Sequence, residues 1–449
     1  MKNTMGSKEK TKETGKSEEE KALRYRRRDR KWERLDNTAN IFPAIAGEEM
    51  TNTYRWCVVL NDPVDPKALQ EAVDILTPRM PGFNLRLRNG AFWFYLEEIH
   101  APAPRVKEEA EYPCRLIHAN RNNQYMFRVS YYANRINIEC FHALADGTGI
   151  IIFGKELVYH YLRCAHPDLL EKYGDKLSPE TFTAREDSFV KYFKKNYKIE
   201  YSTKKAYLLH GERLPYRGFG VILGIVSLSE LKAMVKSKYD MTLNDYLVAC
   251  FIYAIYKTAK RKASKKRPIK ISVPVDLRPF FGSMTTKNFF CMVSAEFAPE
   301  KEDYTFEEVA KIIHDDLKKK ITKENLESIF SFTVSYTQMF VAKIIPLFFK
   351  NLAMKIFYLK AAKSNTSTIT NIGNLKLDSP YDEYVKFIYC FLPFSAGQRM
   401  KGTITSFKDT MVYTVVSAYK DTSVQREIFR QMASDGINVT IETNGVYYE

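Results

Sequence analysis

The chain has 449 residues, of which 69 are Lys or Arg and 53 are Asp or Glu, so its formal net charge is +16. With 45% hydrophobic residues it can bury a sizeable core, which excludes a collagen-like, low-complexity or small disulfide-stabilised protein. The seven cysteines form no C-x-x-C pair, which favours free thiols and predicts no metal site. No apolar run suits a signal peptide or a membrane span, so we expect a cytoplasmic protein.

The positive charge is concentrated at the start of the chain. Residues 1–34 hold 13 Lys and Arg against 7 Asp and Glu, and almost no apolar residue precedes Ala22. A segment of this composition cannot bury enough apolar surface to fold alone. We therefore predict a basic disordered tail over residues 1–34.

Residues 35–195 predict a first half that mixes strands with helices. Period-2 alternation and turn signals such as Asn89-Gly90 indicate the strands, and 3.6-residue periodicity indicates the helices. The expected strands are 54–60, 83–87, 91–96, 124–133 and 135–143, and the expected helices are 65–76 and 148–163.

We predict that residues 196–216 form a crossover segment that connects the two halves. The patterns in residues 217–449 predict a second half of the same kind. Its expected strands are 221–227, 271–275, 289–297, 366–372, 386–391, 403–407 and 411–418. Its expected helices are 229–236, 243–257, 306–320, a pair within 330–359 broken near Pro346, and 422–432.

One segment, residues 136–148, carries residues suited to chemistry. Strand alternation places His142 at the end of an apolar row, so its imidazole should point inward. Asp146-Gly147 follows as a turn into the next helix, where the glycine would let the chain turn sharply and the aspartate would hold the turn or cap the helix. The alternative interpretation of His142 is a core histidine at a strand end.

This segment resembles the H-H-x-x-x-D-G motif of the superfamily that includes chloramphenicol acetyltransferase, nonribosomal-peptide condensation domains and alcohol acetyltransferases. The resemblance covers residues of about 35–445. It includes an Arg-rich early motif at 79–87, the V-P-V-D-L-R-P sequence at 273–279 and the T-N-I-G-N turn at 370–374. Phe141 replaces the first histidine of the pair. The D-F-G-W-G signature of the superfamily's plant acyltransferases is absent, which argues against that branch, and the resemblance is to the alcohol acetyltransferase-like branch.

The resemblance implies an α/β fold of two chloramphenicol acetyltransferase-like halves, each a mixed sheet with helices, that form a V around a tunnel. It implies acyl transfer from a thioester donor, either acyl-coenzyme A or a carrier protein, to a hydroxyl or amine acceptor. Acyl-coenzyme A would be a co-substrate, and no bound cofactor is expected. Histidine can remove the acceptor's proton near neutral pH, so His142 is the expected general base.

Other residues at the expected site have supporting roles. Asp146, Gly147 and Arg278 would be structural, with Asp146 in a buried ion pair to Arg278 or, as second candidate, to Arg86. Asn371 and Gly373 are candidates for oxyanion donors or tunnel residues, and the alternative is that they only form a turn.

Two further segments suggest partners. The basic run 260–267, with Lys262, Lys265 and Lys266, would bind the phosphates of coenzyme A or an acidic carrier, unless it is simply a solvated loop. The lysine-rich apolar stretch 330–359 would be a pair of amphipathic helices broken near Pro346 or, alternatively, a peripheral membrane contact. The acceptor would be a small-molecule or lipid-linked alcohol or amine.

The main alternative function is a catalytically silent or condensation-type relative that acts as a binding protein. Nucleic acid is not an expected partner, because no known reader motif occurs and most charges outside the tail are mixed in sign. A monomer is expected, since one chain contains both halves.

Overall fold

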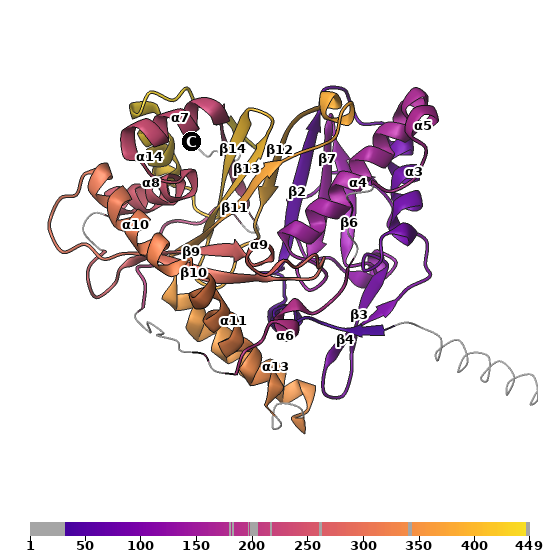
Figure 1. Ribbon diagram of the computed structural model, residues 1–449, viewed down its shortest axis with the longest axis horizontal. Helices are drawn as coiled ribbons and strands as arrows, with labels where there is room; N and C mark the ends of the chain where they lie inside the picture. The colour runs from indigo at the N-terminus through magenta and orange to yellow at the C-terminus, as the bar shows by residue number, and fades with distance from the viewer. Residues whose placement is uncertain are drawn as a thin grey trace, which may run out of the picture.

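The computed structural model describes residues 32–178, 181, 184–195, 197, 205–215, 218–259, 263–339 and 344–445. They form two α/β halves that lie side by side (Figure 1). Residues 1–31 of the predicted tail lie outside the described residues. The last three residues of that tail, Trp32–Arg34, form strand β1, which pairs with β4.

The first half contains a five-stranded sheet of order β12-β2-β7-β6-β5. Its central strands alternate apolar residues, which bury one face against helices α3 and α4. The strands are β2 (Thr53–Leu60), β5 (Lys107–Glu108), β6 (Phe127–Tyr132), β7 (Arg135–Phe141) and β12 (Val385–Phe391). A small sheet of order β1-β4-β3 adjoins it, with β3 (Leu85–Asn89) and β4 (Phe94–Glu98).

The helices of the first half begin at the polar caps that the sequence suggests. Asp65 caps α3 (Pro66–Leu76), and Asp146 caps α4 (Gly147–Ala165). Two short helices, α2 (Ile41–Ile45) and α5 (Pro167–Tyr173), complete this half. The start of α4 is therefore fixed directly after β7.

The second half is built on a seven-stranded sheet of order β10-β9-β11-β13-β14-β8-β15. Its strands are β8 (Gly220–Ser227), β9 (Ile269–Asp276), β10 (Phe290–Phe297), β11 (Ser367–Leu375), β13 (Met400–Phe407), β14 (Thr410–Ser417) and β15 (Thr440–Thr443). Its α-helices are α6 (Ser188–Lys191), α7 (Leu228–Tyr239), α8 (Leu243–Thr258), α9 (Arg278–Phe281), α10 (Phe306–Lys320), α11 (Lys323–Gln338), α13 (Leu347–Ala361) and α14 (Ser423–Ser434). Short 3₁₀ turns lie at Thr77–Arg79, Ala119–Arg121, Ala362–Ser364 and Tyr381–Tyr384.

Strand β12 joins the two halves. It follows β11 in the chain, yet it pairs with β2 of the first half, and it also contacts β13 and β14 of the second (Figure 1). The hydroxyls of Thr403 and Thr405 donate to the carbonyls of Cys390 and Ile388 at 2.6 and 2.8 Å. The strand expected at 386–391 thus exists, but it belongs to the other half's sheet, so the chain does not divide cleanly near residue 217.

Candidate active site

His142 lies directly after β7, where the two halves meet. Its backbone N–H donates to the carbonyl of Asn52 at 2.8 Å, which fixes the end of the strand. The imidazole stacks on Phe42 of α2 with ring centres 4.4 Å apart, and Tyr54 packs at 4.9 Å. The ring is half-buried, so one aromatic wall holds it while part of it remains accessible.

Asn288 fixes the tautomer of this imidazole. Its Nδ2 donates to Asp36 Oδ2 at 2.9 Å and to the backbone carbonyl of His142 at 3.2 Å. The amide oxygen Oδ1 therefore faces His142 Nδ1, 3.0 Å away. An amide oxygen only accepts, so Nδ1 carries the hydrogen and Nε2 keeps a free lone pair.

Asn288 and Asp36 are not among the site residues that the sequence motifs predict. Both are buried, and Asp36 also accepts the N–H of Ala39 at 2.7 Å. Neither residue lies in a recognisable motif, and 252 positions separate them in the chain. Their pairing is a product of the fold that a single sequence does not reveal.

Burial sets the protonation states of this group. It lowers the pKa of His142 from its usual range, with Asp146 opposing the shift, so the imidazole is neutral at pH 7. Burial also raises the pKa of Asp36 to about 6, against hydrogen bonds from Asn288 and Ala39. A neutral imidazole with a free Nε2 is the form that a general base requires.

Asp146 is fully engaged by structural partners. Its Oδ1 accepts the N–H of Gly149 and its Oδ2 accepts the N–H of Phe289, both at 3.0 Å. Nη2 of Arg278 lies 3.0 Å from each carboxylate oxygen. This carboxylate therefore caps α4 and joins the two halves.

Arg278 holds the other side of this junction. It donates to Asp276 at 2.9 Å and to the carbonyls of Thr285 and Lys287, and it is buried. Arg86, the second candidate partner of Asp146, instead pairs with Glu97 at 2.7 Å.

The position in this motif that requires glycine is not the expected Gly147. Gly147 has no left-handed φ, and a Cβ there would meet only Ile372 Cδ1 at 3.9 Å. The turn is made by Asp146 itself, whose backbone is extended (φ −89°, ψ −173°). The tight position is Gly149, where a Cβ would lie 2.4 Å from the carbonyl oxygen of Thr286. A side chain at Gly147 would therefore make one ordinary van der Waals contact and no clash.

Asn371 and Gly373 lie in a bulge of β11, and Ile372 between them contacts the space beside Gly147. The N–H of Gly373 donates to Asn371 Oδ1 at 2.9 Å, and Gly373 has a left-handed φ of +86°. These contacts are those of a turn, and they leave the Gly373 N–H engaged.

Lys265 and Lys266, the lysines of the basic run that the structure describes, lie far from the Arg278 end of β9. Lys265 and Lys266 precede the start of β9, whereas Arg278 follows its end, and an eight-residue strand spans about 25 Å. Lys265 is exposed and pairs with Glu300 at 2.8 Å. Lys262 lies outside the described residues.

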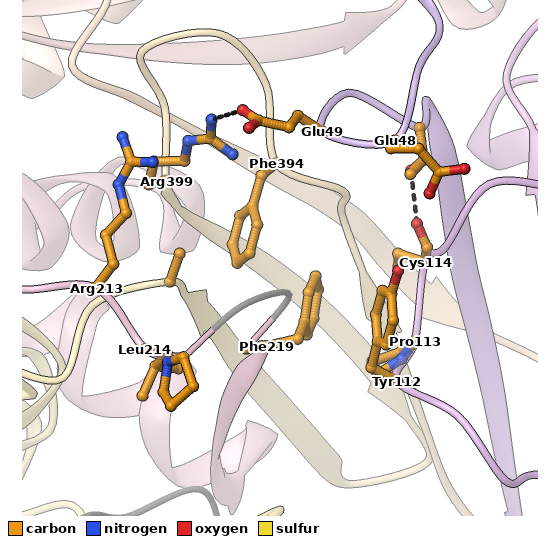
Figure 2. Close-up of a pocket in the computed structure, with 14 residues that line it drawn as sticks. Glu48, Glu49, Tyr112, Pro113, Cys114, Arg213, Leu214, Phe219, Phe394 and Arg399 are labelled. Atoms are coloured by element: carbon orange, nitrogen blue, oxygen red, sulfur yellow. Dashed lines mark hydrogen bonds and ion pairs between the residues drawn. The ribbon is translucent and has the colours of Figure 1, made fainter.

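A pocket of about 190 Å³ opens between the halves (Figure 2). The first half contributes Thr51, which precedes the Asn52 that binds the His142 backbone. The second half contributes two guanidinium groups, Arg213 and Arg399, beside aromatic rings (Figure 2). Arg399 pairs with Glu49 at 2.6 Å, and Arg213 has no ion-pair partner within the described part of the chain. Glu48 and Glu49 also line the pocket, so its charged side chains are two guanidinium groups and two carboxylates.

Lys401 is a buried charged residue between the halves. It alternates along β13 with Met400 of the core and so shares a face with Thr403, which binds β12. It is buried, and it makes no hydrogen bond or ion pair with a described residue. Burial lowers the pKa of its ammonium group to about 8.

No model of a known protein family matches the sequence, and no curated protein matches it. Solved structures do match. The trichothecene 15-O-acetyltransferase of Fusarium sporotrichioides aligns over 90% of this chain and 95% of its own, with 11% identity and a TM-score of 0.60. TRI101 of F. sporotrichioides, complexed with coenzyme A and T-2, aligns over 92% and 99%, with 11% identity and a TM-score of 0.57.

An epimerization domain from the third module of tyrocidine synthetase B also aligns, over 90% of this chain and 96% of its own, with 11% identity and a TM-score of 0.56. Together these likenesses show the fold that the sequence motif suggested. The chain has the mixed α/β fold of these acetyltransferases and of the epimerization domain.

The described residues contain neither a candidate metal site nor a candidate membrane-spanning helix. No group of three or more His, Cys, Asp or Glu side chains is placed to hold a metal ion in this part of the chain. Within the same residues, no helix has the length and apolar character that crossing a bilayer would require.

Proposed function

We propose that this protein is an acyltransferase that moves an acyl group from a thioester donor to a hydroxyl or amine acceptor. The observation that carries this proposal is the neutral imidazole of His142, whose Nδ1 is held by Asn288 and whose Nε2 is unprotonated. The fold supports it, because solved structures with this fold include acetyltransferases.

The chemical step follows from this geometry. His142 Nε2 takes the proton of the acceptor O–H or N–H as the acceptor atom attacks the thioester carbonyl carbon. The tetrahedral intermediate then collapses, the carbon–sulfur bond breaks, and the imidazolium returns the proton to the leaving thiolate. The products are an ester or amide and a free thiol, and no covalent acyl-enzyme forms.

Asp146 takes no part in this proton transfer. Its two oxygens are occupied by two backbone N–H groups and Arg278. Its role in the proposal is to fix the turn that follows His142 and to tie it to the loop that carries Asn288. His142 is thus the catalytic residue, and Asn288 and Asp146 are positioning residues.

The pocket of Figure 2 is the proposed entrance for the donor. Coenzyme A carries phosphates, and the guanidinium group of Arg213 suits phosphate oxygens, whereas that of Arg399 is paired with Glu49. TRI101, a structural neighbour, was solved in complex with coenzyme A. Arg213→Ala should raise KM for an acyl-coenzyme A several-fold but leave KM for an acyl-pantetheine, which lacks the nucleotide phosphates, unchanged. An equal rise for both donors would refute this entrance.

The function is tested by thiol release over a panel of acyl-coenzyme A and carrier-bound donors combined with alcohol and amine acceptors. We expect acceptor-dependent thiol release for at least one pair. His142→Ala should lower that rate by at least about 100-fold while the far-UV and near-UV circular dichroism spectra stay unchanged. His100→Ala, which removes an exposed histidine, is the matched control and should be fully active.

Two results would contradict the proposal. Full thiol release by a folded His142→Ala protein would remove His142 as the base. Absence of thiol release with every donor, together with tight binding of one of them, would instead support a catalytically silent relative.

A further inference from the structure

Helix α13 presents a large apolar surface to solvent. Phe348 is 74% exposed and Leu352 is 52% exposed, and of the helix's residues only Leu347 is buried. We define the α13 surface as Phe348, Phe349, Leu352, Ile356 and Leu359, all of which are exposed large hydrophobic residues. At about 100° per residue these five side chains fall within an arc of about 100°, whereas Phe357, 68% exposed, lies outside this arc. Such an arc normally faces a protein core, so this one marks an interaction site.

Positive charge borders this surface on both sides. On the same helical projection Lys355 lies just before the arc and Lys360 just after it. The sequence has no Asp or Glu between Glu327 and Asp378, whereas the same stretch contains six lysines. An apolar face flanked by lysines and free of acids is the pattern of a helix that lies on an anionic lipid surface.

The neighbouring elements add to this pattern. Lys350, on the opposite side of α13, donates to the carbonyl of Phe92 at 2.7 Å and lies 3.5 Å from the centre of the Trp93 ring. The tip of the β3–β4 hairpin, with Phe92 exposed, is thereby joined to α13. Strand β1 pairs with β4 of the same hairpin, and the eleven residues before β1 include seven Lys or Arg and one Asp. β1, this hairpin and α13 lie along the same edge of the molecule (Figure 1).

A second copy of the chain is a poor occupant of this surface. In a symmetric dimer the α13 surface would meet itself, so its lysines would oppose lysines without acidic partners. Anionic lipid headgroups supply the complementary charge, and the acyl region accepts the phenylalanine and leucine side chains. We propose that the α13 surface docks the protein onto an anionic lipid bilayer.

This docking would place the candidate site next to the membrane. α13 packs against α2, and Phe42 of α2 stacks directly on His142. The acceptor would then be an apolar or lipid-borne alcohol or amine delivered from the bilayer. The delivery of an acceptor from the bilayer rests on the proposed function, whereas the docking itself does not.

The test is flotation of the full-length protein with vesicles of phosphatidylcholine alone or mixed in equal parts with phosphatidylglycerol. We expect binding to the mixed vesicles only, and release at high salt. We expect two double variants to lower the partition coefficient for the mixed vesicles by about 10-fold or more. One is Phe348→Ser/Leu352→Ser, and the other is Lys355→Glu/Lys360→Glu. Tyr132→Ser/Met284→Ser and Lys318→Glu/Lys319→Glu, which change exposed residues elsewhere, are the matched controls and should bind like wild type.

Three outcomes would overturn the docking proposal. They are absence of binding to mixed vesicles, equal binding by wild type and both α13 variants, and a wild-type dimer in analytical ultracentrifugation that Phe348→Ser/Leu352→Ser converts to a monomer. His142→Ala should float like wild type, so a failure of catalysis and a failure of docking are separate results.

Discussion

Substituting Asp146 by Asn tests how the two halves are held together at the site. The change keeps the shape of the side chain but removes the charge that faces Arg278, and it places an NH₂ group where an oxygen accepts a backbone N–H. Removing one partner of a buried ion pair costs about 3–5 kcal/mol, because the other charge is left without compensation. Both side chains are buried, so solvent does not screen this loss.

Arg278 retains part of its environment in this variant. Asp276 and two backbone carbonyls still accept from it, so we expect the lower end of that range, about 3 kcal/mol of unfolding free energy. Equilibrium urea denaturation measures this loss. Asp276→Asn, which removes a half-exposed partner of the same arginine, is the control and should cost about 1 kcal/mol or less.

A double-mutant cycle with Arg278→Gln identifies the partner. Residues in one network couple by about 0.5–3 kcal/mol, whereas independent sites add. Strict additivity of the Asp146 and Arg278 changes would refute the pair. Loss of turnover by Asp146→Asn without any change in unfolding free energy would refute the structural role, because it would indicate participation in proton transfer.

Three further predictions follow from individual contacts. Asn288→Ala should lower kcat at least about 10-fold with little change in the KM of the donor or of the acceptor, because His142 then loses its fixed tautomer. An unchanged kcat would contradict this role of Asn288. Lys401→Met should raise the unfolding free energy at pH 7 by up to about 3 kcal/mol, because the fold lowers the pKa of this buried ammonium group to about 8. The wild type should gain stability as pH rises from 8 to 10.5, where only the unfolded chain stays protonated, and the variant should lack that slope in pH-dependent denaturation. Gly149→Ala should destabilise the fold by about 1–3 kcal/mol in urea denaturation, whereas Gly147→Ala, with open space at its Cβ, should not.

The local parts of the structure could be predicted from the sequence. Helix α10 has the predicted bounds, because it carries a regular apolar period after a clear cap. Helix α8 differs from the prediction by one residue at its end, and β14 differs by one residue at each end, since both are continuous apolar runs. The strand, turn and helix around His142 were also foreseeable from alternation and from the aspartate before α4. The membrane-contact alternative for residues 330–359 rests on composition alone and stays a prediction.

Contacts between distant segments could not be predicted in this way. The transfer of β12 to the first half's sheet depends on pairing with β2, which no local pattern encodes. Asn288 and Asp36 look like ordinary loop residues until the fold brings them to His142. The partner of Asp146 was proposed only through a resemblance to known motifs, since spacing along the chain does not distinguish Arg278 from Arg86.

The central claim is that His142 presents a neutral imidazole with an unprotonated Nε2. Nitrogen-15 NMR of the protein labelled at histidine measures this directly, with His142→Gln identifying the signal. The account predicts the Nδ1–H tautomer at pH 7.5 and a pKa below the usual value of 6.5, because burial disfavours the charged ring. An Nε2–H tautomer, or an imidazolium that persists at neutral pH, would contradict the account.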